Sequence, residues 1–309
     1  MSLAKILLAA DGSEDATLAS KAAADLSAKT GAELHVVYAW HLPGMVEPAP
    51  LPFELYEADA RKVLAEELGR VAEHGAKTVK GHLKRDHPVD AILGLGDELG
   101  VDLIVVGSRG RGPVLRIALG SVSEGVAYRT ARPVLVVRGG AGAWPPRRVV
   151  VGDDRSDQSR RAGELAAEIG HLFGARMTLV RATEGQTLPG RLTGPETRAH
   201  ARRLDEAHAK HEEELALRTE ELARTPGTPA EIRLAEGDGA AAILGVCKED
   251  PATLVAVGAR GRDYIRRALL GGVSTKVLRA ARGPVLVHAT PPGSAASKAA
   301  GMVDSATRA

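Results

Sequence analysis

The sequence predicts two copies of an α/β domain, each an open, parallel, five-stranded sheet with helices on both faces. Three observations support this prediction. The chain has 309 residues, which is twice the ~150 typical of one domain. Two long segments of the chain repeat one another. In each copy, short apolar runs alternate with amphipathic stretches, which is the pattern of a parallel sheet covered on both sides.

The repeat keeps its register over most of each copy. Gly107 matches Gly258, Gly120 matches Gly271 and Pro133 matches Pro284, in each case 151 residues later. Nearer the start of the copies, Asp11 matches Asp154 at an offset of 143 residues. The second copy therefore carries a net insertion of 8 residues before its glycine-rich loop. Three anchors in one register indicate an internal duplication.

The elements of the first copy follow from its periodicity. Apolar runs bounded by turn residues predict five strands: Lys5–Ala10, Leu34–Trp40, Val79–Leu83, Leu103–Val106 and Val134–Val137. The stretches between them predict helices over Ser13–Lys29, Glu54–His74, Val89–Leu99 and Ser121–Thr130. Gly31 is a natural stop for the first helix. The four prolines within His41–Pro52 predict a loop.

Composition shifts place the domain boundaries. We expect a first domain over residues 1–139, a linker over 140–146, a second domain over 147–290 and a disordered tail over 291–309. The linker is rich in glycine and proline, which favour neither helix nor strand. The tail consists of small and polar residues. Within the second domain, Arg198–Arg224 is a densely charged stretch that predicts a solvated helix.

Composition also excludes several classes of function. Lys+Arg is 41 and Asp+Glu is 39, so the net charge of +2 gives no general attraction to nucleic acid or to membranes. Only 2 Phe, 4 Tyr and 2 Trp are present, too few for a surface that stacks bases. The single Cys247 excludes a disulfide framework, and the histidines show no metal-like cluster, so no metal site is predicted. The first residues do not form a signal peptide and no apolar run is long enough to span a membrane, so we expect a cytoplasmic protein.

The chemistry is expected where the first and fourth strands end. Ligands of open parallel sheets bind beyond the carboxyl ends of the strands. Asp11 ends the first strand and Gly107 ends the fourth, so a carboxylate and a glycine loop face one crevice if these strands are neighbours. Glycines at Gly107 and Gly110 allow backbone N–H groups to approach phosphate oxygens.

A helix start adds to this predicted anion site. Gly120 and Ser121 open a helix whose first N–H groups are expected to be free, and such groups attract anions. Arg109 and Arg111 add positive charge. The residues therefore favour a nucleotide pocket. The alternative is structural: the glycines then form a tight turn, the aspartates form turns or helix caps, and Ser121 caps its helix.

The spacing of the glycines narrows the choice of family. The Gly-x-Gly-x-x-Gly of dinucleotide-binding folds does not follow the first strand, and Gly110 is followed by Arg111 and Gly112 rather than by the Lys-Ser/Thr of a P-loop. What is present is Gly-x2-Gly-x9-Gly-Ser, formed by Gly107, Gly110, Gly120 and Ser121. With this motif directly after an apolar strand, the chain resembles the universal stress protein family, tandem-domain type. The resemblance covers Lys5–Arg138 and Arg147–Ala289.

The resemblance implies a strand order of 3-2-1-4-5 in each domain and ATP as the ligand, with or without Mg²⁺. It assigns nucleotide binding in the first copy to Ala9, Asp11, Gly107, Arg109, Gly110, Arg111, Gly120, Ser121 and Val122. It assigns the same role in the second copy to Gly152, Asp154, Gly258, Arg260, Gly261, Arg262, Gly271, Gly272 and Val273.

Two of these residues depart from the family pattern. Gly272 stands where the pattern has Ser or Thr, and Ala9 stands where a Gly is usual. The missing hydroxyl at position 272 predicts weaker ATP binding in the second copy than in the first.

The resemblance predicts an ATP-binding regulatory protein, a nucleotide sensor of the stress response with one pocket per domain. No nucleophile is paired with a His base, so catalysis is not predicted beyond a slow hydrolysis of ATP. The competing class is a nucleotide-free interaction protein of the same fold. The two domains are expected to pair through their fifth strands, Val134–Val137 and Val285–His288, as an intramolecular pseudo-dimer. Pairing of two chains into a homodimer stays open.

Overall fold

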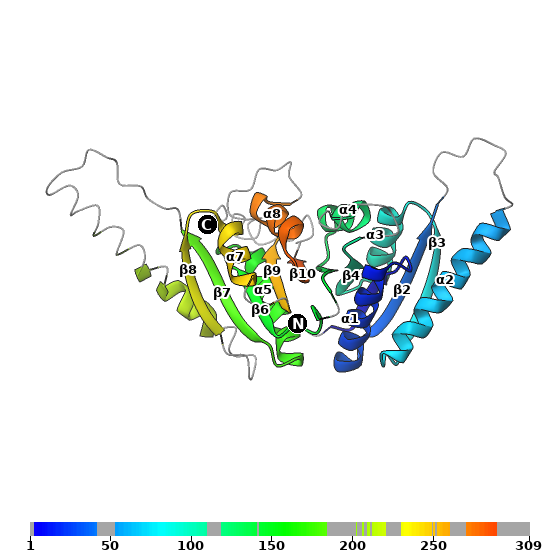
Figure 1. The fold of residues 1–309 in the computed structure, drawn as a ribbon, viewed down its shortest axis with the longest axis horizontal. Helices are drawn as coiled ribbons and strands as arrows, with labels where there is room; N and C mark the ends of the chain where they lie inside the picture. Colours follow the sequence, from blue (N-terminus) through cyan, green and yellow to red (C-terminus); the bar gives the residue numbers. More distant parts are fainter. Residues whose placement is uncertain are drawn as a thin grey trace, which may run out of the picture.

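Ten strands of the chain form one continuous sheet. The structure is a computed structural model, which describes residues 3–41, 53–109, 119–140, 142–183, 202, 206, 209–210, 212–220, 230–248, 250, 252–259 and 270–288. Within these residues the strand order is β3-β2-β1-β4-β5-β10-β9-β6-β7-β8 (Figure 1). Each half therefore has the order 3-2-1-4-5, as the resemblance implied. The expected tail over 291–309 lies outside the described residues.

The first half contains all the strands and helices that its periodicity predicts. Its strands are β1 Lys5–Ala9, β2 Glu33–Trp40, β3 Val79–Arg85, β4 Leu103–Gly107 and β5 Val134–Val137. Its helices are α1 Glu14–Thr30, α2 Phe53–Glu73, α3 Pro88–Leu99 and α4 Ser121–Arg129. The strands pair in parallel, with Leu7 of β1 opposite His35 on one side and Ile104 on the other. Gly31 ends α1 with a φ of +77°, the left-handed conformation that glycine adopts without strain.

The second half repeats this arrangement. Its strands are β6 Arg148–Gly152, β7 Arg176–Thr183, β8 Ala230–Glu236, β9 Thr253–Gly258 and β10 Val285–His288. Its helices are α5 Asp157–Leu172, α7 Gly239–Cys247 and α8 Gly272–Ala280. Residues 212–220 are also helical and represent the described core of the predicted charged stretch.

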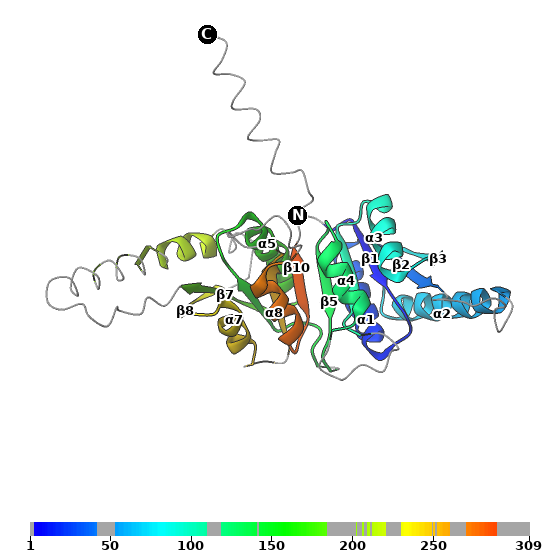
Figure 2. The same ribbon diagram turned by 90° about the horizontal axis from the view of Figure 1, so that it is seen from above.

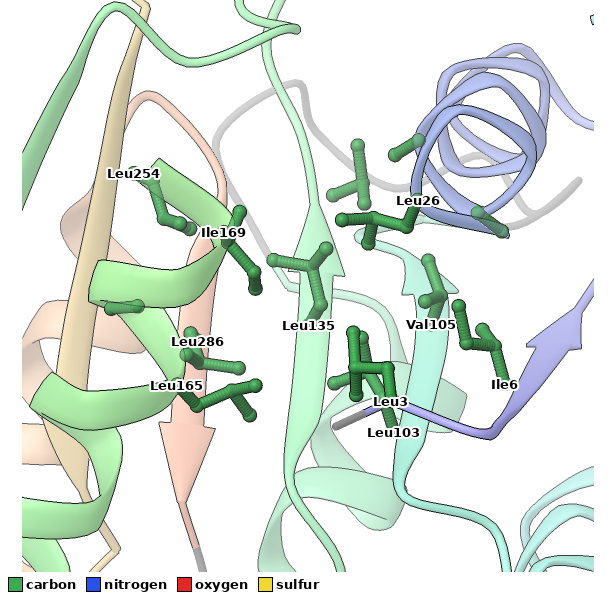
Figure 3. Close-up of a cluster of buried hydrophobic side chains, with 14 of the residues drawn as sticks. Leu3, Ile6, Leu26, Leu103, Val105, Leu135, Leu165, Ile169, Leu254 and Leu286 are labelled. Carbon is green, nitrogen blue, oxygen red and sulfur yellow. The ribbon is translucent and has the colours of Figure 1, made fainter. Parts of the chain in front are cut away.

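Two aliphatic layers cover the sheet, because successive side chains of each strand point to opposite faces. Ile6 and Leu8 of β1 pack with α1 on one face, in a cluster that also includes residues of α2, α5 and Leu215. Leu7 points to the other face, where residues of α3, α4, α7 and α8 form the second cluster. Figure 3 shows that the first cluster continues from one half of the molecule into the other.

The two halves join through their fifth strands, as predicted. β5 and β10 pair antiparallel, with Leu135 opposite Leu286 (Figures 2 and 3). This pairing covers two strand edges that would otherwise be open to other chains. Helices α4 and α8 lie beside the same strands, and the hydroxyl of Tyr128 donates to Thr275 at 3.2 Å. Arg138, which follows β5, donates to the carbonyl of Leu278 in α8 at 2.7 Å.

A buried histidine ends the seam strand β10. His288 is only 4% exposed, and its Nδ1 has no hydrogen-bond partner among the described residues. Burial, with a smaller contribution from the positive charge of Arg161, lowers the pKa of His288 from its ordinary value of 6.5 to about 4. The first copy has Val137 at this place, so the fold does not require an imidazole here.

We therefore expect His288 to make folding pH-dependent. Between about pH 4 and pH 6.5 the unfolded chain binds more protons at this residue than the folded chain, so stability rises with pH through this window. The contribution is complete above pH 6.5 and is lost as the pH falls toward 4. The variant His288→Val should lose a slope of up to about 1.4 kcal/mol per pH unit, measured by urea unfolding at several pH values. His35 and His82, whose pKa values burial also lowers, contribute equally to both proteins. Parallel pH profiles for the two proteins would contradict this expectation.

Candidate functional site

The sheet topology places the first strand of each half, β1 or β6, at a switch point. β1 lies between β2 and β4, and β6 lies between β7 and β9. The chain leaving β1 enters α1 on one face of the sheet, whereas the chain after β4 leads to α4 on the other. Connections that diverge in this way make the carboxyl ends of the two strands the usual ligand site of an open parallel sheet. We call residues 9–15, 107–109 and 119–123 the first site, and residues 152–158, 258–259 and 270–274 the second site.

Hydrogen bonds tie the loop after β1 to the loop after β4 in the first site. The Oδ1 of Asp11 accepts from the backbone N–H of Ser13 at 3.0 Å, so Asp11 forms the turn that precedes α1. The hydroxyl of Ser13 caps α1 by accepting from the N–H of Ala16 at 3.2 Å, and donates to the carbonyl of Arg109 at 3.1 Å. The structure thus brings Asp11 and the loop after Gly107 together, as the sequence predicted.

Gly107 and Gly258 allow a helix to approach the end of a strand. A Cβ at Gly107 would lie 2.9 Å from the carbonyl carbon of Asp15, and one at Gly258 would lie 2.8 Å from the backbone nitrogen of Ser159. Real Cβ atoms do not come this close to backbone. These two glycines of the motif therefore have a packing reason that holds without any ligand, which the sequence reasoning did not identify.

The start of α4 offers fewer free amides than expected. The N–H of Gly120 already donates to the carbonyl of Ser108 at 2.7 Å, and the N–H of Gly271 donates to Ala259 at 2.6 Å. The hydroxyl of Ser123 also bonds to Ser108, at 2.8 Å. The first bond inside α4 runs from Glu124 to Gly120, so the N–H groups of residues 121–123 keep the position of free donors at a helix start. The anion-binding potential therefore belongs to Ser121 and Val122 rather than to Gly120.

A buried carboxylate occupies the centre of the first site. Asp15, in the first turn of α1, is 7% exposed. It accepts a hydrogen bond from Ser108 at 2.6 Å, and one each from Nε and Nη2 of Arg109 at 2.9 Å. Arg109, which the resemblance assigned to phosphate, is thus held by Asp15. Asp15 and Ser108 were not predicted as site residues, because no local pattern predicts a contact between residues 93 positions apart.

The second site repeats the turns of the first but not its charges. Asp154 accepts from the N–H of Ser156 at 3.0 Å, and Ser156 caps α5. Gln158 stands where the first copy has Asp15, and Ala259 stands where it has Ser108. Gly272 is exposed and has no atom within 4 Å of an added Cβ, so a serine side chain would fit there.

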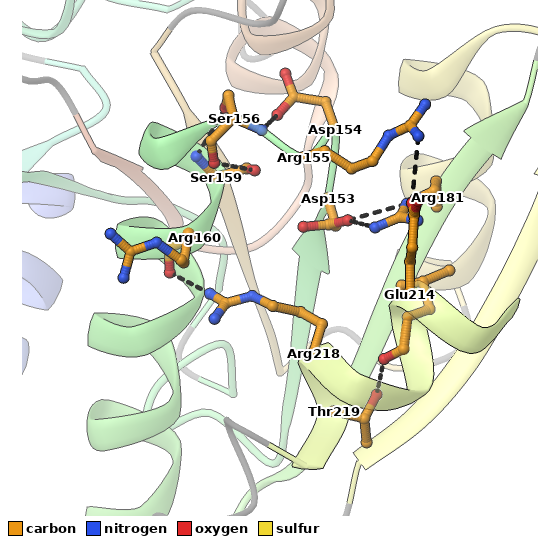
Figure 4. Close-up of polar contacts among 11 residues, drawn as sticks. Asp153, Asp154, Arg155, Ser156, Ser159, Arg160, Arg181, Glu214, Arg218 and Thr219 are labelled. Carbon is orange, nitrogen blue, oxygen red and sulfur yellow. Dashed lines mark hydrogen bonds and ion pairs between the residues drawn. The ribbon is translucent and has the colours of Figure 1, made fainter. Parts of the chain in front are cut away.

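A buried ion pair distinguishes the second half further. Arg181, on β7, donates through Nε to Asp153 at 3.0 Å and through Nη1 to Glu214 at 3.2 Å. Figure 4 shows Arg181 pointing toward Asp153, which follows β6 directly. The side chains of Arg181 and Asp153 are 5% and 4% exposed. The first copy has Ala10 and Tyr38 at these positions, so this pair is a feature of the second copy alone.

Arg155 joins this group from the turn after β6. It donates to Glu214 at 3.2 Å (Figure 4). Its φ is +66°, at the place where the first copy has Gly12 with a φ of +74°. An arginine is uncommon in the left-handed region, which glycine adopts without strain. The sequence analysis did not identify Asp153, Arg155, Arg181 or Glu214, although two adjacent aspartates after a buried strand were a visible signal for Asp153.

The remaining predicted residues fall into two groups. Ala9 and Gly152 end β1 and β6, Val122 is half-buried, and Val273 is exposed in the first turn of α8. Five predicted residues lie outside the described part of the chain: Gly110, Arg111, Arg260, Gly261 and Arg262. In the part that is described, no group of three or more His, Cys, Asp or Glu side chains is placed to hold a metal ion. No helix described here combines the length and apolarity needed to cross a membrane.

Comparison with known proteins decides the family. The model of the universal stress protein family matches the chain twice, over residues 3–138 and 146–288. The chain belongs to this family. A universal stress protein of Mycobacterium tuberculosis is 31% identical over 301 residues, covering 91% of this chain and 96% of its own length. The chain is therefore a tandem universal stress protein, which confirms the resemblance seen in its sequence.

A solved structure that covers nearly the whole chain agrees on the fold. A universal stress protein from Archaeoglobus fulgidus covers 93% of this chain and 98% of its own, with a TM-score of 0.66 and 24% identity. A universal stress protein in complex with cAMP covers 44% of this chain and 98% of its own, at 29% identity and a TM-score of 0.36. That family member binds an adenine nucleotide.

The packing role of Gly107 predicts an asymmetric pair of substitutions. Gly107→Ala should destabilise the protein by about 1–3 kcal/mol, because its Cβ would collide with the backbone of α1. Gly272→Ala, in the corresponding motif of the second copy, is the matched control. It should change stability by less than about 0.5 kcal/mol, since its Cβ meets open space. Urea unfolding followed by circular dichroism measures both. An equal effect of the two changes would contradict the packing explanation.

The buried pair Asp153–Arg181 predicts strong coupling between its two partners. Asp153→Ala removes the buried carboxylate to which the guanidinium of Arg181 donates and should destabilise the protein by about 3–5 kcal/mol. Adding Arg181→Tyr installs both residues of the first copy and should recover most of this loss. A double-mutant cycle of unfolding free energies measures the coupling. If the double variant is as unstable as the sum of the single variants, the pair is not coupled.

Proposed function

We propose that the protein is an ATP-binding regulator of the cytoplasm with one nucleotide site in each repeat. The observation that carries this proposal is the position of the start of α4 and of α8 beside the switch point of each half. Helix N–H groups without acceptors in their own helix bind phosphate oxygens. The N–H groups of Ser121 and Val122 would hold phosphate in the first site, together with the hydroxyl of Ser121. Gly272 and Val273 would supply the corresponding amides in the second.

The other proposed contacts surround these amides. In Asp11 and in Asp154, one carboxylate oxygen accepts a hydrogen bond within the turn before the helix. The other oxygen would accept a hydrogen bond from a sugar hydroxyl or a base amine of the nucleotide. Gly110, Arg111, Gly261 and Arg262 are proposed to complete the phosphate seat, with Mg²⁺ optional. The sequence pairs no nucleophile with a histidine base, so the proposed role of ATP is to bias a conformation or an interaction rather than to be consumed.

A second candidate, a nucleotide-free interaction protein, is favoured by one observation. The close packing at Gly107 and Gly258 explains one glycine of each motif without any ligand. On this alternative, the loops only shape a surface for a protein partner. The two candidates differ in whether protein purified without added ligand releases an adenine nucleotide, which mass spectrometry identifies.

The hydroxyl at the helix start separates the two sites. Ser121→Gly should weaken ATP binding at the first site, and the reciprocal Gly272→Ser should strengthen it at the second, each by roughly ten- to a hundredfold. This range corresponds to one hydrogen bond to a charged group, about 1.5–3 kcal/mol. Isothermal titration calorimetry of the full chain with ATP measures both changes, with thermal unfolding as the control for folding.

The expected starting point is a first site that binds ATP more tightly than the second. If neither the natural protein nor Gly272→Ser binds any adenine nucleotide, the proposed function is wrong and the interaction protein is favoured. If the protein turns over ATP steadily and Ser121→Gly abolishes that turnover, the protein is an enzyme rather than a sensor.

A further inference from the structure

The first site has a negatively charged side chain of its own, the carboxylate of Asp15. The carboxylate of Asp15 accepts hydrogen bonds from the hydroxyl of Ser108 and from two N–H groups of Arg109, with donor–acceptor distances of 2.6, 2.9 and 2.9 Å. With a side chain that is 8% exposed, this carboxylate is shielded from water, so its charge is little screened. The guanidinium that could neutralise a phosphate is thereby neutralised from within the protein.

The neighbouring positive charge is also engaged. Arg138 comes near Asp15 and Arg109 from the end of β5, and burial lowers its pKa. Its Nη1 donates to the carbonyls of Leu278 and Arg279 in α8 at 2.7 and 3.5 Å. A phosphate group approaching the first site therefore meets one buried negative charge, with the two described guanidinium groups beside it already bonded to protein.

The second site lacks this internal anion. Gln158 replaces Asp15, so the first turn of α5 carries a neutral amide at the corresponding position. Ala259 replaces Ser108 and has no hydroxyl to donate. The carboxylate of the second half that is comparably buried, Asp153, is bound by Arg181 of β7 instead. The protein thus offers the same helix start twice, once beside a buried carboxylate and once without it.

We propose that Asp15 sets the charge selectivity of the first site. Its carboxylate competes with phosphate for Arg109 and repels each further negative charge of the ligand. Binding at the first site therefore discriminates against triphosphate relative to monophosphate unless a divalent cation reduces the ligand's charge. The second site, with Gln158, makes no such distinction. This inference rests on the proposed function, because it concerns how the same site chooses among adenine nucleotides.

The test removes the charge while keeping the shape. Asp15→Asn should raise the affinity of the full chain for ATP without Mg²⁺ by roughly tenfold, and for AMP by less than about threefold, because the repulsion scales with ligand charge. With Mg²⁺ present, the gain for ATP should shrink toward that for AMP. Calorimetric titrations with AMP, ADP and ATP, with and without Mg²⁺, measure this series. Raising the salt concentration should reduce the gain as well.

Two further variants separate charge from structure. Ser108→Ala removes one hydrogen bond of Asp15 but keeps its charge, so the preference among AMP, ADP and ATP should not weaken. Gln158→Asp introduces the carboxylate into the second site and should weaken ATP there more than AMP. Thermal unfolding of each variant verifies that it is folded.

The outcomes distinguish this inference from the proposed function. If the natural protein binds no adenine nucleotide, the proposed function fails first. If it binds nucleotides but Asp15→Asn changes AMP and ATP affinity equally, Asp15 has a structural role and the inference is wrong. If Asp15→Asn weakens ATP binding, Asp15 orients Arg109 toward phosphate, which also overturns the inference.

Discussion

The close approach of the first turn of α1 to the end of β4 is the contact on which the first site depends. It is possible only because Gly107 has no side chain, since a Cβ there would lie 2.9 Å from the backbone of Asp15. The approach brings Asp15 within reach of Ser108 and Arg109 and lets Ser13 bridge to the same loop. It also fixes the end of β4 against the start of α4, through the bonds from Gly120 and Ser123 to Ser108. The absence of a side chain at Gly107 thus allows the segments after β1 and β4 and before α4 to pack together.

The duplication preserves this contact and changes the charges around it. Gly258 allows the same approach of α5 to β9. Ser274, the counterpart of Ser123, also bonds to the end of its strand, but it donates to the carbonyl of Gly258 at 2.5 Å, one residue before the counterpart of Ser108. The acid of the first site becomes Gln158, whereas an acid appears at Asp153 on a strand end that carries Ala10 in the first copy. The scaffold is thus common to both halves, and the electrostatic surroundings of each helix start are particular to one half.

The sequence predicts what depends on local pattern and on repetition. Strand periodicity located β1 to β5 to within one or two residues, and Gly31 marked the end of α1. The pairing of β5 with β10 was also predicted, but from the resemblance, and it covers two strand edges that would otherwise be open. The strand order came from the resemblance and not from the pattern, since periodicity does not determine which strands are neighbours.

The contacts that sequence reasoning missed are nonlocal and depend on side-chain direction. Asp15 reaches Arg109 across 94 positions. Glu14 and Asp15 are adjacent acids at the start of α1, and nothing in the sequence indicates that Asp15 points inward. Arg181 pairs with Asp153 across 28 positions because Asp153 directly follows β6 and Arg181 lies on the neighbouring strand β7. The role of Gly107 was missed for a related reason: a ligand-binding glycine and a packing glycine are identical in sequence, and only the distance to the backbone of α1 distinguishes them.

The seam explains why the two sites could diverge while the fold could not. β5 and β10 must stay complementary, because Leu135 and Leu286 face each other and both halves of the first hydrophobic cluster meet there. A polar side chain at either position would be buried in the cluster and would destabilise both domains at once. Among the described residues, the hydrogen bonds of the acids at the switch points stay within one half: Asp15 accepts from Ser108 and Arg109, and Asp153 accepts from Arg181. Substitutions such as Asp15 for Gln158 or Ser121 for Gly272 can therefore accumulate without affecting the joint. In a fused pseudo-dimer of this kind, ligand preference is decided by a few side chains at each strand end, and the shared sheet holds the two different sites in one molecule.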